Sequence, residues 1–195
     1  MNFQNTNKPS KVVLSVGDES GIGPEIILKA LYSNEIPENI EYILVGSKKN
    51  LQNTYENLRS LGLENLANPK NLKIQDIEIC PSNNDPKSSY GDSSFQYLKK
   101  AIEIVKQYPN AALVTGPICK KSWSLAGHYF SGQTEVLAKS CSVKNVGMLF
   151  TAKSPITGWR FNTLLATTHI ALSEVPKKLT KELIHSKLDL FKDFC

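Results

Sequence analysis

Short runs of aliphatic residues alternate with amphipathic segments along most of the chain, and this alternation constrains the fold more than any other feature. The runs at residues 11–17 (KVVLSVG), 41–47 (EYILVGS) and 111–116 (AALVTG) are continuous and rich in β-branched residues, as in strands buried on both faces. The helical patterns between and after them cover residues 24–33, 49–61 and 92–107. Strand–helix alternation predicts an α/β fold with a parallel or mixed sheet and helices on both faces.

The remaining segments extend this pattern. Residues 71–79 (NLKIQDIEI) alternate with period two and predict a more exposed edge strand, and residues 80–89 predict a polar loop rich in turn formers. Later elements are expected as a helix at 133–140, strands at 146–151 and 163–167, and an amphipathic helix from Thr180.

These segments divide into two expected domains. Residues 1–127 are expected to form a first α/β domain, without the later segment of chain that would return to it from the C-terminal side. Residues 128–195 are expected to begin a second one, which is incomplete because the last helical pattern runs to Cys195 without a cap, Gly or Pro.

Composition excludes several classes of protein. Hydrophobic residues make up 41% and charged residues 21%, as in a soluble globular protein, and no apolar stretch approaches the ~18 residues that span a membrane. The polar first eleven residues are unlike a secretory signal, so we expect a frayed terminus and a cytoplasmic protein. The net charge of +5 comes from scattered lysines, which argues against nucleic acid and suits small anionic substrates or simple solubility. The four cysteines form no C-x-x-C pair and are expected to be reduced thiols.

Two motifs follow predicted strands in the first half of the chain. Residues 17–26 (GDESGIGPEI) form a glycine-rich turn that could approach a ligand or could simply be tight, and their spacing is not G-x-G-x-x-G. Residues 115–121 (TGPICKK) place Lys120 where a phosphate or carboxylate could meet it, although an exposed loop lysine is more often solvated.

Two further motifs lie in the second half. In residues 131–135 (SGQTE), an amide and a hydroxyl could bind an anionic or hydroxylated ligand, or the segment could only begin a helix. In residues 166–170 (ATTHI), His169 ends an apolar strand, where its imidazole could ligate a divalent metal or serve a structural role. His185 is expected on a helix surface.

Taken together and in order, these motifs resemble the 4-hydroxythreonine-4-phosphate dehydrogenase family. The resemblance rests on GDESGIGPEI, LVTGPICK, AGHYFSGQTEVLA and LLATTHIALSEVP, which are spread over nearly the whole chain. It implies an isocitrate/isopropylmalate dehydrogenase-like fold with two α/β domains and a cleft. It also implies a homodimer in which both subunits build each active site, with no membrane and no nucleic acid as partner.

The resemblance also implies a reaction. NAD would oxidise 4-phosphohydroxy-L-threonine, a small phosphorylated hydroxy-amino acid, and loss of carbon dioxide would give 3-amino-2-oxopropyl phosphate for pyridoxal phosphate biosynthesis. A divalent metal cation (Zn, Mg or Co) would polarise the oxygen that is oxidised.

The family's functional residues carry over at three positions. His169 matches the first of three metal-binding histidines, and Gln133 and Thr134 match a substrate-binding His-Thr pair. The motifs with the other two metal histidines do not occur in these 195 residues, and no catalytic or NAD-binding residue is assigned.

The chain departs from the family pattern at several positions. Glu19 and Ser20 stand where Pro-Ala is usual, and Cys119 stands where asparagine is usual. Gln133 stands in place of a histidine, and a glutamine can hydrogen-bond a phosphate but cannot become cationic. Two alternatives therefore stay open: a dehydrogenase of a related four-carbon phosphate of the threonate or erythronate type, or a non-catalytic truncated remnant.

Overall fold

The computed structural model describes residues 10–78 and 85–194. Residues 1–9 of the expected frayed terminus, residues 80–84 of the expected 80–89 loop and the uncapped chain end at Cys195 lie outside these ranges. Lys11, the last residue of the expected frayed terminus, instead begins the first strand. The chain divides into two compact units, residues 1–132 (unit 1) and 133–195 (unit 2), and each is described by itself.

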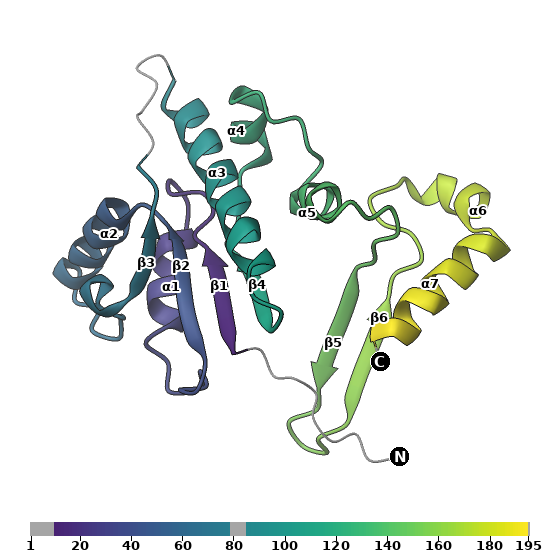
Figure 1. Cartoon of the computed structure of the whole chain (residues 1–195), viewed down its shortest axis with the longest axis horizontal. Helices are drawn as coiled ribbons and strands as arrows, with labels where there is room; N and C mark the ends of the chain where they lie inside the picture. Colours follow the sequence, from purple (N-terminus) through teal and green to yellow (C-terminus); the bar gives the residue numbers. More distant parts are fainter. Residues whose placement is uncertain (1–9, 79–84, 195) are drawn as a thin grey trace. The chain divides into compact units, whose positions relative to one another are not determined.

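Unit 1 is built on a four-stranded parallel sheet in the order β3-β2-β1-β4 (Figure 1). Strand β1 lies between β2 and β4, and its first residue, Lys11, pairs with Glu41 of β2 and with Ala111 of β4. The period-two segment forms an edge strand, as predicted, although it is shorter than residues 71–79. The strands are β1 (Lys11–Ser15), β2 (Glu41–Gly46), β3 (Lys73–Asp76) and β4 (Ala111–Thr115).

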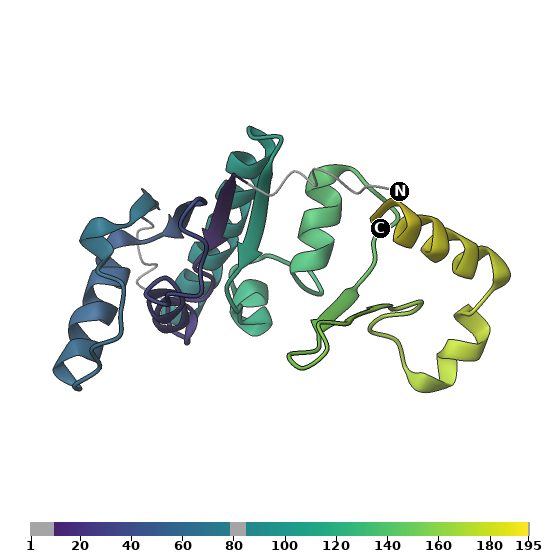
Figure 2. The ribbon, with the colours of Figure 1, turned by 90° about the horizontal axis from the view of Figure 1, so that it is seen from below.

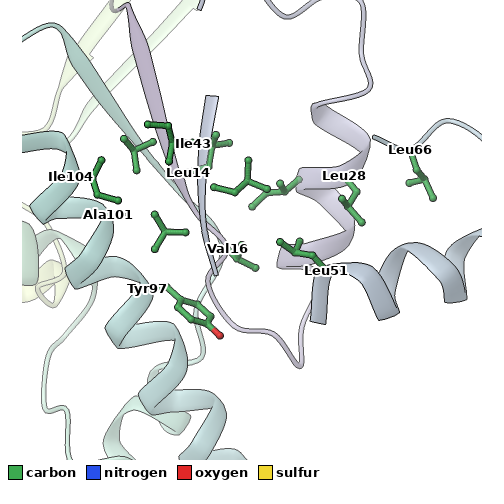
Figure 3. Close-up of a cluster of buried hydrophobic side chains, with 13 residues drawn as sticks. Leu14, Val16, Leu28, Ile43, Leu51, Leu66, Tyr97, Ala101 and Ile104 are labelled. Carbon is green, nitrogen blue, oxygen red and sulfur yellow. The ribbon is translucent and has the colours of Figure 1, made fainter. Parts of the chain in front are cut away.

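Helices cover both faces of this sheet, as the alternation predicts. They are α1 (Gly23–Ala30), α2 (Lys48–Ser60), which is followed by a 3-10 turn at Pro69–Asn71, and α3 (Pro86–Lys106). Figure 3 shows Leu28 and Leu51, from α1 and α2, on one side of the strands and Tyr97, Ala101 and Ile104, from α3, on the other. The buried core between them consists of Val13, Leu14, Val16, Ile27, Leu28, Ile43, Leu44, Val45, Leu51, Leu66, Tyr97, Ala101 and Ile104.

The start of α3 corrects one prediction. The segment before residue 92 is expected to be a loop, but the helix begins at Pro86. The Asp85 side chain accepts a hydrogen bond from the Lys87 backbone N–H at 2.9 Å, and Pro86 occupies the first turn. Asp, Pro and Ser favour turns, but the same residues favour a helix N-terminus, and here the second role applies.

A short helix that the sequence analysis does not predict follows β4. This helix, α4 (Lys120–Leu125), packs on α3 through Trp123, which is fully buried. The Trp123 indole N–H donates to Ser94 Oγ at 2.7 Å, so the one polar group of this large side chain is satisfied.

Unit 2 contains an antiparallel hairpin and helices. Its elements are α5 (Gln133–Cys141), β5 (Leu149–Lys153), β6 (Arg160–Leu164), a 3-10 turn (Leu172–Glu174), α6 (Val175–Lys178) and α7 (Lys181–Phe194). The predicted strands at 146–151 and 163–167 are each wrong by about three residues, because β5 starts later and β6 earlier. Both strands lie closer to the turn that connects them than the most apolar residues do. The pairing runs from Leu149↔Leu164 to Lys153↔Arg160.

The hairpin has two different faces. Residues opposite each other in an antiparallel pair point to the same side, so Phe150, Phe161 and Thr163 share one face, and Leu164 and Asn162 share the other. Asn162 and Leu164 line a cavity with Ile184 and Leu188 of α7, and Figures 1 and 2 show α7 beside the hairpin. The Phe150 and Phe161 face is therefore the outer one, and these two side chains are 55% and 52% exposed.

No helix within residues 10–78 and 85–194 has both the length and the apolar character needed to cross a membrane.

Candidate functional site

A cavity of about 110 Å³ in unit 2 brings two of the three predicted site residues together. Thr134 reaches it from the first turn of α5, and His169 from the loop after β6. These residues are 35 positions apart in sequence, so the fold of unit 2 creates their proximity. We call this space the Thr134–His169 cavity; its wall consists of Thr134, Glu135, Ala138, Val146, Gly147, Met148, Leu165, Ala166, Thr168, His169 and Lys187.

His169 has an uncommon backbone conformation. Its φ is +56°, in the left-handed region, where few residues other than glycine occur and where histidine is enriched several-fold. The prediction that His169 ends a strand is wrong in detail, because β6 stops at Leu164 and His169 lies five residues further along an exposed loop. Its ring has no hydrogen-bond partner among the residues that the structure describes, so both ring nitrogens are available to a ligand.

Gln133 and Thr134 are the first two residues of α5. The segment therefore begins a helix, as one interpretation predicts, and it also contributes a residue to the cavity, as the other predicts. Thr134 is exposed and lines the cavity, whereas Gln133 is half-buried and is not one of the lining residues. Residues in the first turn of a helix present free backbone N–H groups and the positive end of the helix dipole. The start of α5 thus places the Thr134 hydroxyl at the positive end of a helix dipole, which favours an anion.

Two charged side chains complete the wall of the Thr134–His169 cavity. Glu135 in α5 is the one carboxylate among the lining residues, and Lys187 in α7 is the one lysine or arginine. The Lys187 ammonium donates to the backbone carbonyl of Val146, another lining residue, and lies 3.5 Å from Asn145 Oδ1. The cavity therefore contains one anchored cation and one acid.

In unit 1, the glycine-rich motif proves to be a turn of close backbone contacts. Gly17 has φ +79°, and a Cβ placed there would lie 2.3 Å from the carbonyl oxygen of Pro117. The Asp18 backbone N–H donates to that same oxygen at 2.9 Å, which ties the turn after β1 to the loop after β4. Close backbone approach therefore explains Gly17 and also Gly23, where a Cβ would lie 2.2 Å from the Val16 carbonyl oxygen, whereas at Gly21 a Cβ would make only ordinary contacts.

Glu19 occupies this turn, where the family usually has proline. Tyr97 of α3, which is buried, donates its hydroxyl hydrogen bond to Glu19 Oε1. Burial and the neighbouring Asp18 carboxylate raise the pKa of Glu19 to about 7, although a hydrogen bond from the Ser47 backbone N–H acts in the opposite direction. The turn therefore has a carboxyl group that changes charge near neutral pH.

The motif after β4 forms the start of α4. Cys119 is the N-cap residue, and hydrogen bonds from the side chain and backbone N–H of Ser122 lower the pKa of its thiol. Lys120 is exposed and has no ion pair within the residues described, as expected for a solvated lysine, but it lies in the first turn of α4 and not in a loop.

The other two histidines belong to different surroundings. His128 in unit 1 stacks on Phe95 with a centroid separation of 3.8 Å, and its Nε2 lies 2.8 Å from Asp92 Oδ1. His185 is exposed on α7, as predicted. Within the described part of the chain, no group of three or more His, Cys, Asp or Glu side chains is arranged to hold a metal ion.

Comparison with known proteins identifies the family. Residues 38–195 match the model of the family described as "Pyridoxal phosphate biosynthetic protein PdxA". The chain belongs to this family. The resemblance seen in the motifs is thereby confirmed.

Curated relatives in the PdxA family share much of the sequence. The chain is 43% identical over 188 residues to the 4-hydroxythreonine-4-phosphate dehydrogenase of Synechococcus sp. (strain RCC307), a match that covers 95% of the chain and 56% of that relative. It is 42% identical over 207 residues to the same-named protein of Nostoc sp. (strain PCC 7120 / SAG 25.82 / UTEX 2576), with 98% and 57% covered. The chain thus spans a little over half the length of the relatives that it matches.

Solved structures with PdxA-family names share the fold. The 4-hydroxythreonine-4-phosphate dehydrogenase of Klebsiella pneumoniae aligns with a TM-score of 0.75 at 21% identity, covering 97% of this chain and 59% of that one. The protein of the same name from Burkholderia phymatum aligns with a TM-score of 0.73 at 20% identity, covering 93% and 56%. This α/β architecture, with its parallel sheet, is therefore that of known PdxA-family structures.

Sequence reasoning does not find two charged residues of the Thr134–His169 cavity. Glu135 follows the predicted pair directly, but as a carboxylate in a helix's first turn it needs no functional explanation. Lys187 is one of many lysines and lies in an amphipathic helix whose period says nothing about neighbours 53 residues away. No local signal distinguishes Lys187 from the other lysines of α7.

Proposed function

We propose that the protein containing this chain oxidises and decarboxylates 4-phosphohydroxy-L-threonine, with NAD as the hydride acceptor, to give 3-amino-2-oxopropyl phosphate. The observation that carries the proposal is that Thr134 and His169, assigned to substrate and metal by the family motifs, line a single cavity. The names of the Synechococcus and Nostoc relatives support the substrate.

The residues present are compatible with a divalent metal at His169. Its exposed ring is free of hydrogen bonds to the described residues, as a ligand imidazole must be at one nitrogen. A bound cation supplies Lewis-acid polarisation of the hydroxyl oxygen that is oxidised. Since this chain places only one such side chain at the cavity, the remaining ligands must come from other residues of the protein or of a second subunit.

The proposed reaction has a simple balance. The substrate alcohol loses two electrons and two protons, as one hydride that passes to NAD and one proton that leaves. The resulting β-keto acid then loses carbon dioxide, and the carbon that carried the carboxylate takes up one proton to give the amino-ketone phosphate. Thr134 would hold the substrate phosphate at the start of α5, where the positive end of the helix dipole favours an anion. Gln133, which is not among the lining residues, would add a neutral hydrogen bond from its amide.

The test separates a ligand role of His169 from a structural one. Replacing His169 with Ala in the natural protein should lower metal affinity by at least ~10–100-fold, because losses of groups that only orient a ligand already reach that range. Metal content per folded molecule is measured by elemental analysis, folding by circular dichroism, and turnover by NADH absorbance. His185→Ala, on the exposed face of α7, is the matched control. A folded His169→Ala protein that keeps its metal and its turnover would show that the assignment is wrong.

A second substrate class is favoured by one specific observation. The chain is also 27% identical over 196 residues to a relative from Oceanobacillus iheyensis (strain DSM 14371 / CIP 107618 / JCM 11309 / KCTC 3954 / HTE831) that carries the provisional name D-threonate 4-phosphate dehydrogenase. Gln133 lacks the charge of the usual histidine, so a threonate- or erythronate-type phosphate is the alternative substrate. Turnover of 4-phosphohydroxy-L-threonine and D-threonate 4-phosphate side by side decides between them.

We also propose that units 1 and 2 belong to two α/β domains of an isocitrate/isopropylmalate dehydrogenase-like protein, with a cleft for the reaction. The protein would be a cytoplasmic homodimer in which both subunits build each site. The outer face of the β5–β6 hairpin supports the dimer, because Phe150 and Phe161 leave an apolar surface uncovered there.

A further inference from the structure

We propose that Lys187 is a phosphate-binding residue, and that it supplies from α7 the positive charge that Gln133 does not. The inference rests on the proposed function in one respect, namely that the ligand of the Thr134–His169 cavity carries a phosphate. It adds a specificity-determining residue on an element that contains none of the family motifs.

The position of Lys187 is the first support. It lines the same cavity as Thr134, Thr168 and His169, and it is half-buried. Its ammonium donates to the Val146 carbonyl and lies 3.5 Å from Asn145 Oδ1, so two neutral oxygens orient it. A lysine has three donors, and these neutral acceptors leave its positive charge uncompensated.

The charge balance of the cavity is the second support. A phosphate monoester carries a charge of about −1.5 to −2 at neutral pH, as phosphorylated side chains do. Thr134 and Thr168 offer hydroxyl groups without charge, and Glu135 in the same wall repels an anion. Of the lining residues, only Lys187 is a lysine or arginine, so it is the group that can offset both the phosphate and Glu135.

The size of the cavity agrees with a small anionic group. About 110 Å³ is several times the ~10–15 Å³ that a single water molecule requires. Lysine acts on phosphate as a compact point charge, which needs no bidentate geometry and tolerates approach from one side of such a cavity.

The experiment compares four variants of the natural protein. Lys187→Gln removes the charge but keeps a donor for the Val146 carbonyl, and Lys187→Arg keeps the charge. Lys192→Gln is the matched control, because Lys192 is an exposed lysine of the same helix and is not among the residues that line the cavity. The fourth variant combines Lys187→Gln with Gln133→His. Binding of 4-phosphohydroxy-L-threonine and of inorganic phosphate is measured by calorimetry, with circular dichroism as the folding check.

The proposal predicts a definite pattern. Lys187→Gln should weaken both ligands by roughly 10- to 100-fold, the range expected for a lost hydrogen bond to a charged group. Lys187→Arg should bind within about threefold of the natural protein, and Lys192→Gln should be unchanged. Adding Gln133→His to Lys187→Gln should restore part of the lost affinity, because a protonated imidazole at position 133 would again give the phosphate a positive charge.

The salt dependence of binding provides a second test, which compares the natural protein with Lys187→Gln. Because a lysine–phosphate contact is screened by ions, raising the salt concentration should weaken phosphate binding to the natural protein and leave the residual binding of Lys187→Gln nearly constant. If Lys187→Gln fails to fold, Lys187→Met, which keeps the aliphatic stem, takes its place in both tests.

The outcomes separate this inference from the proposed function. Unchanged affinity of folded Lys187→Gln or Lys187→Met for both ligands, or salt-independent binding by the natural protein, overturns the role of Lys187 even if the enzyme turns over its substrate. Conversely, Lys187-dependent binding of inorganic phosphate without binding of 4-phosphohydroxy-L-threonine upholds Lys187 and rejects the proposed substrate.

Discussion

At the scale of single residues, Glu19 shows how position changes chemistry. In a fully exposed turn Glu19 would be an ordinary carboxylate. Here it accepts hydrogen bonds from the Tyr97 hydroxyl and the Ser47 backbone N–H and lies beside the Asp18 carboxylate. Burial is the largest cause of its raised pKa, and repulsion by Asp18 is the second. The folded protein therefore binds a proton at Glu19 more tightly than the unfolded chain does.

This shift predicts a pH-dependent effect of Glu19→Gln. The folded pKa is about 7 and the unfolded value is near 4.5, so ionised Glu19 costs stability progressively from pH 4.5 to 7 and fully above that. Glu19→Gln should unfold at the same denaturant concentration as the natural protein near pH 5 and should be more stable at pH 8. After allowance for partial exposure, we expect a gain on the order of 1–2 kcal/mol.

Urea unfolding at pH 5, 6, 7 and 8 measures this difference. Glu38→Gln, at an exposed position before β2, is the control and should show no such trend. A stability difference between Glu19→Gln and the natural protein that is constant over this pH range would contradict the buried position of the carboxyl group.

At the scale of elements, the contact between α3 and α4 depends on a glycine. Gly91 lies inside α3, where glycine is normally ~1 kcal/mol worse than alanine. A Cβ at this position would lie 2.0 Å from the carbonyl oxygen of Ser122 and 2.3 Å from its carbon. The close approach lets Trp123 reach Ser94, so packing here outweighs helix propensity.

Gly91→Ala should therefore destabilise the protein despite the better helix propensity of alanine. The collision is with backbone atoms, so α4 must move, and we expect a net loss of about 1–3 kcal/mol in the free energy of unfolding. Trp123 fluorescence during urea unfolding reports both stability and the burial of the indole. Lys99→Ala, on the exposed side of α3, should be nearly neutral, and an unchanged or more stable Gly91→Ala protein would show that the two helices can separate without cost.

At the scale of the whole molecule, the outer face of the β5–β6 hairpin is the exposed feature that bears on assembly. Phe150 and Phe161 lie on this face, and Trp159 packs on Phe161 with ring centroids 5.8 Å apart. Large aromatic side chains are enriched where two proteins meet, and they contribute most when an interface covers them fully. The proposed homodimer should therefore use this face.

The combined change Phe150→Ser and Phe161→Ser tests the proposed dimer. It should raise the dimer dissociation constant of the natural protein by about tenfold or more, since a tenfold change corresponds to a loss of only ~1.4 kcal/mol in the free energy of association. Analytical ultracentrifugation over a concentration series gives this constant. Tyr129→Ser, at a position in unit 1 that is 81% exposed, is the control, and an unaltered dimer in the double variant would assign the interface elsewhere.

Much of unit 1 follows from the sequence. Three continuous apolar runs are strands, the period-two segment is an edge strand, and helices cover both faces, as predicted. These features depend on local periodicity and on the need to bury apolar side chains, and both are readable from neighbouring residues. The family is equally readable, because its motifs occur in order.

Other features depend on segments far apart in the chain. The start of α3, the existence of α4 and the exact limits of β5 and β6 depend on capping and on pairing register, for which the local pattern allows several solutions. Packing likewise determines which residues meet at the Thr134–His169 cavity. The sequence by itself determined the family and singled out His169 and Thr134 as candidate site residues. Only the tertiary structure decided that Lys187 lies with them and that Glu19 is half-buried beside Asp18, because both depend on distances between residues, which sequence periodicity does not give.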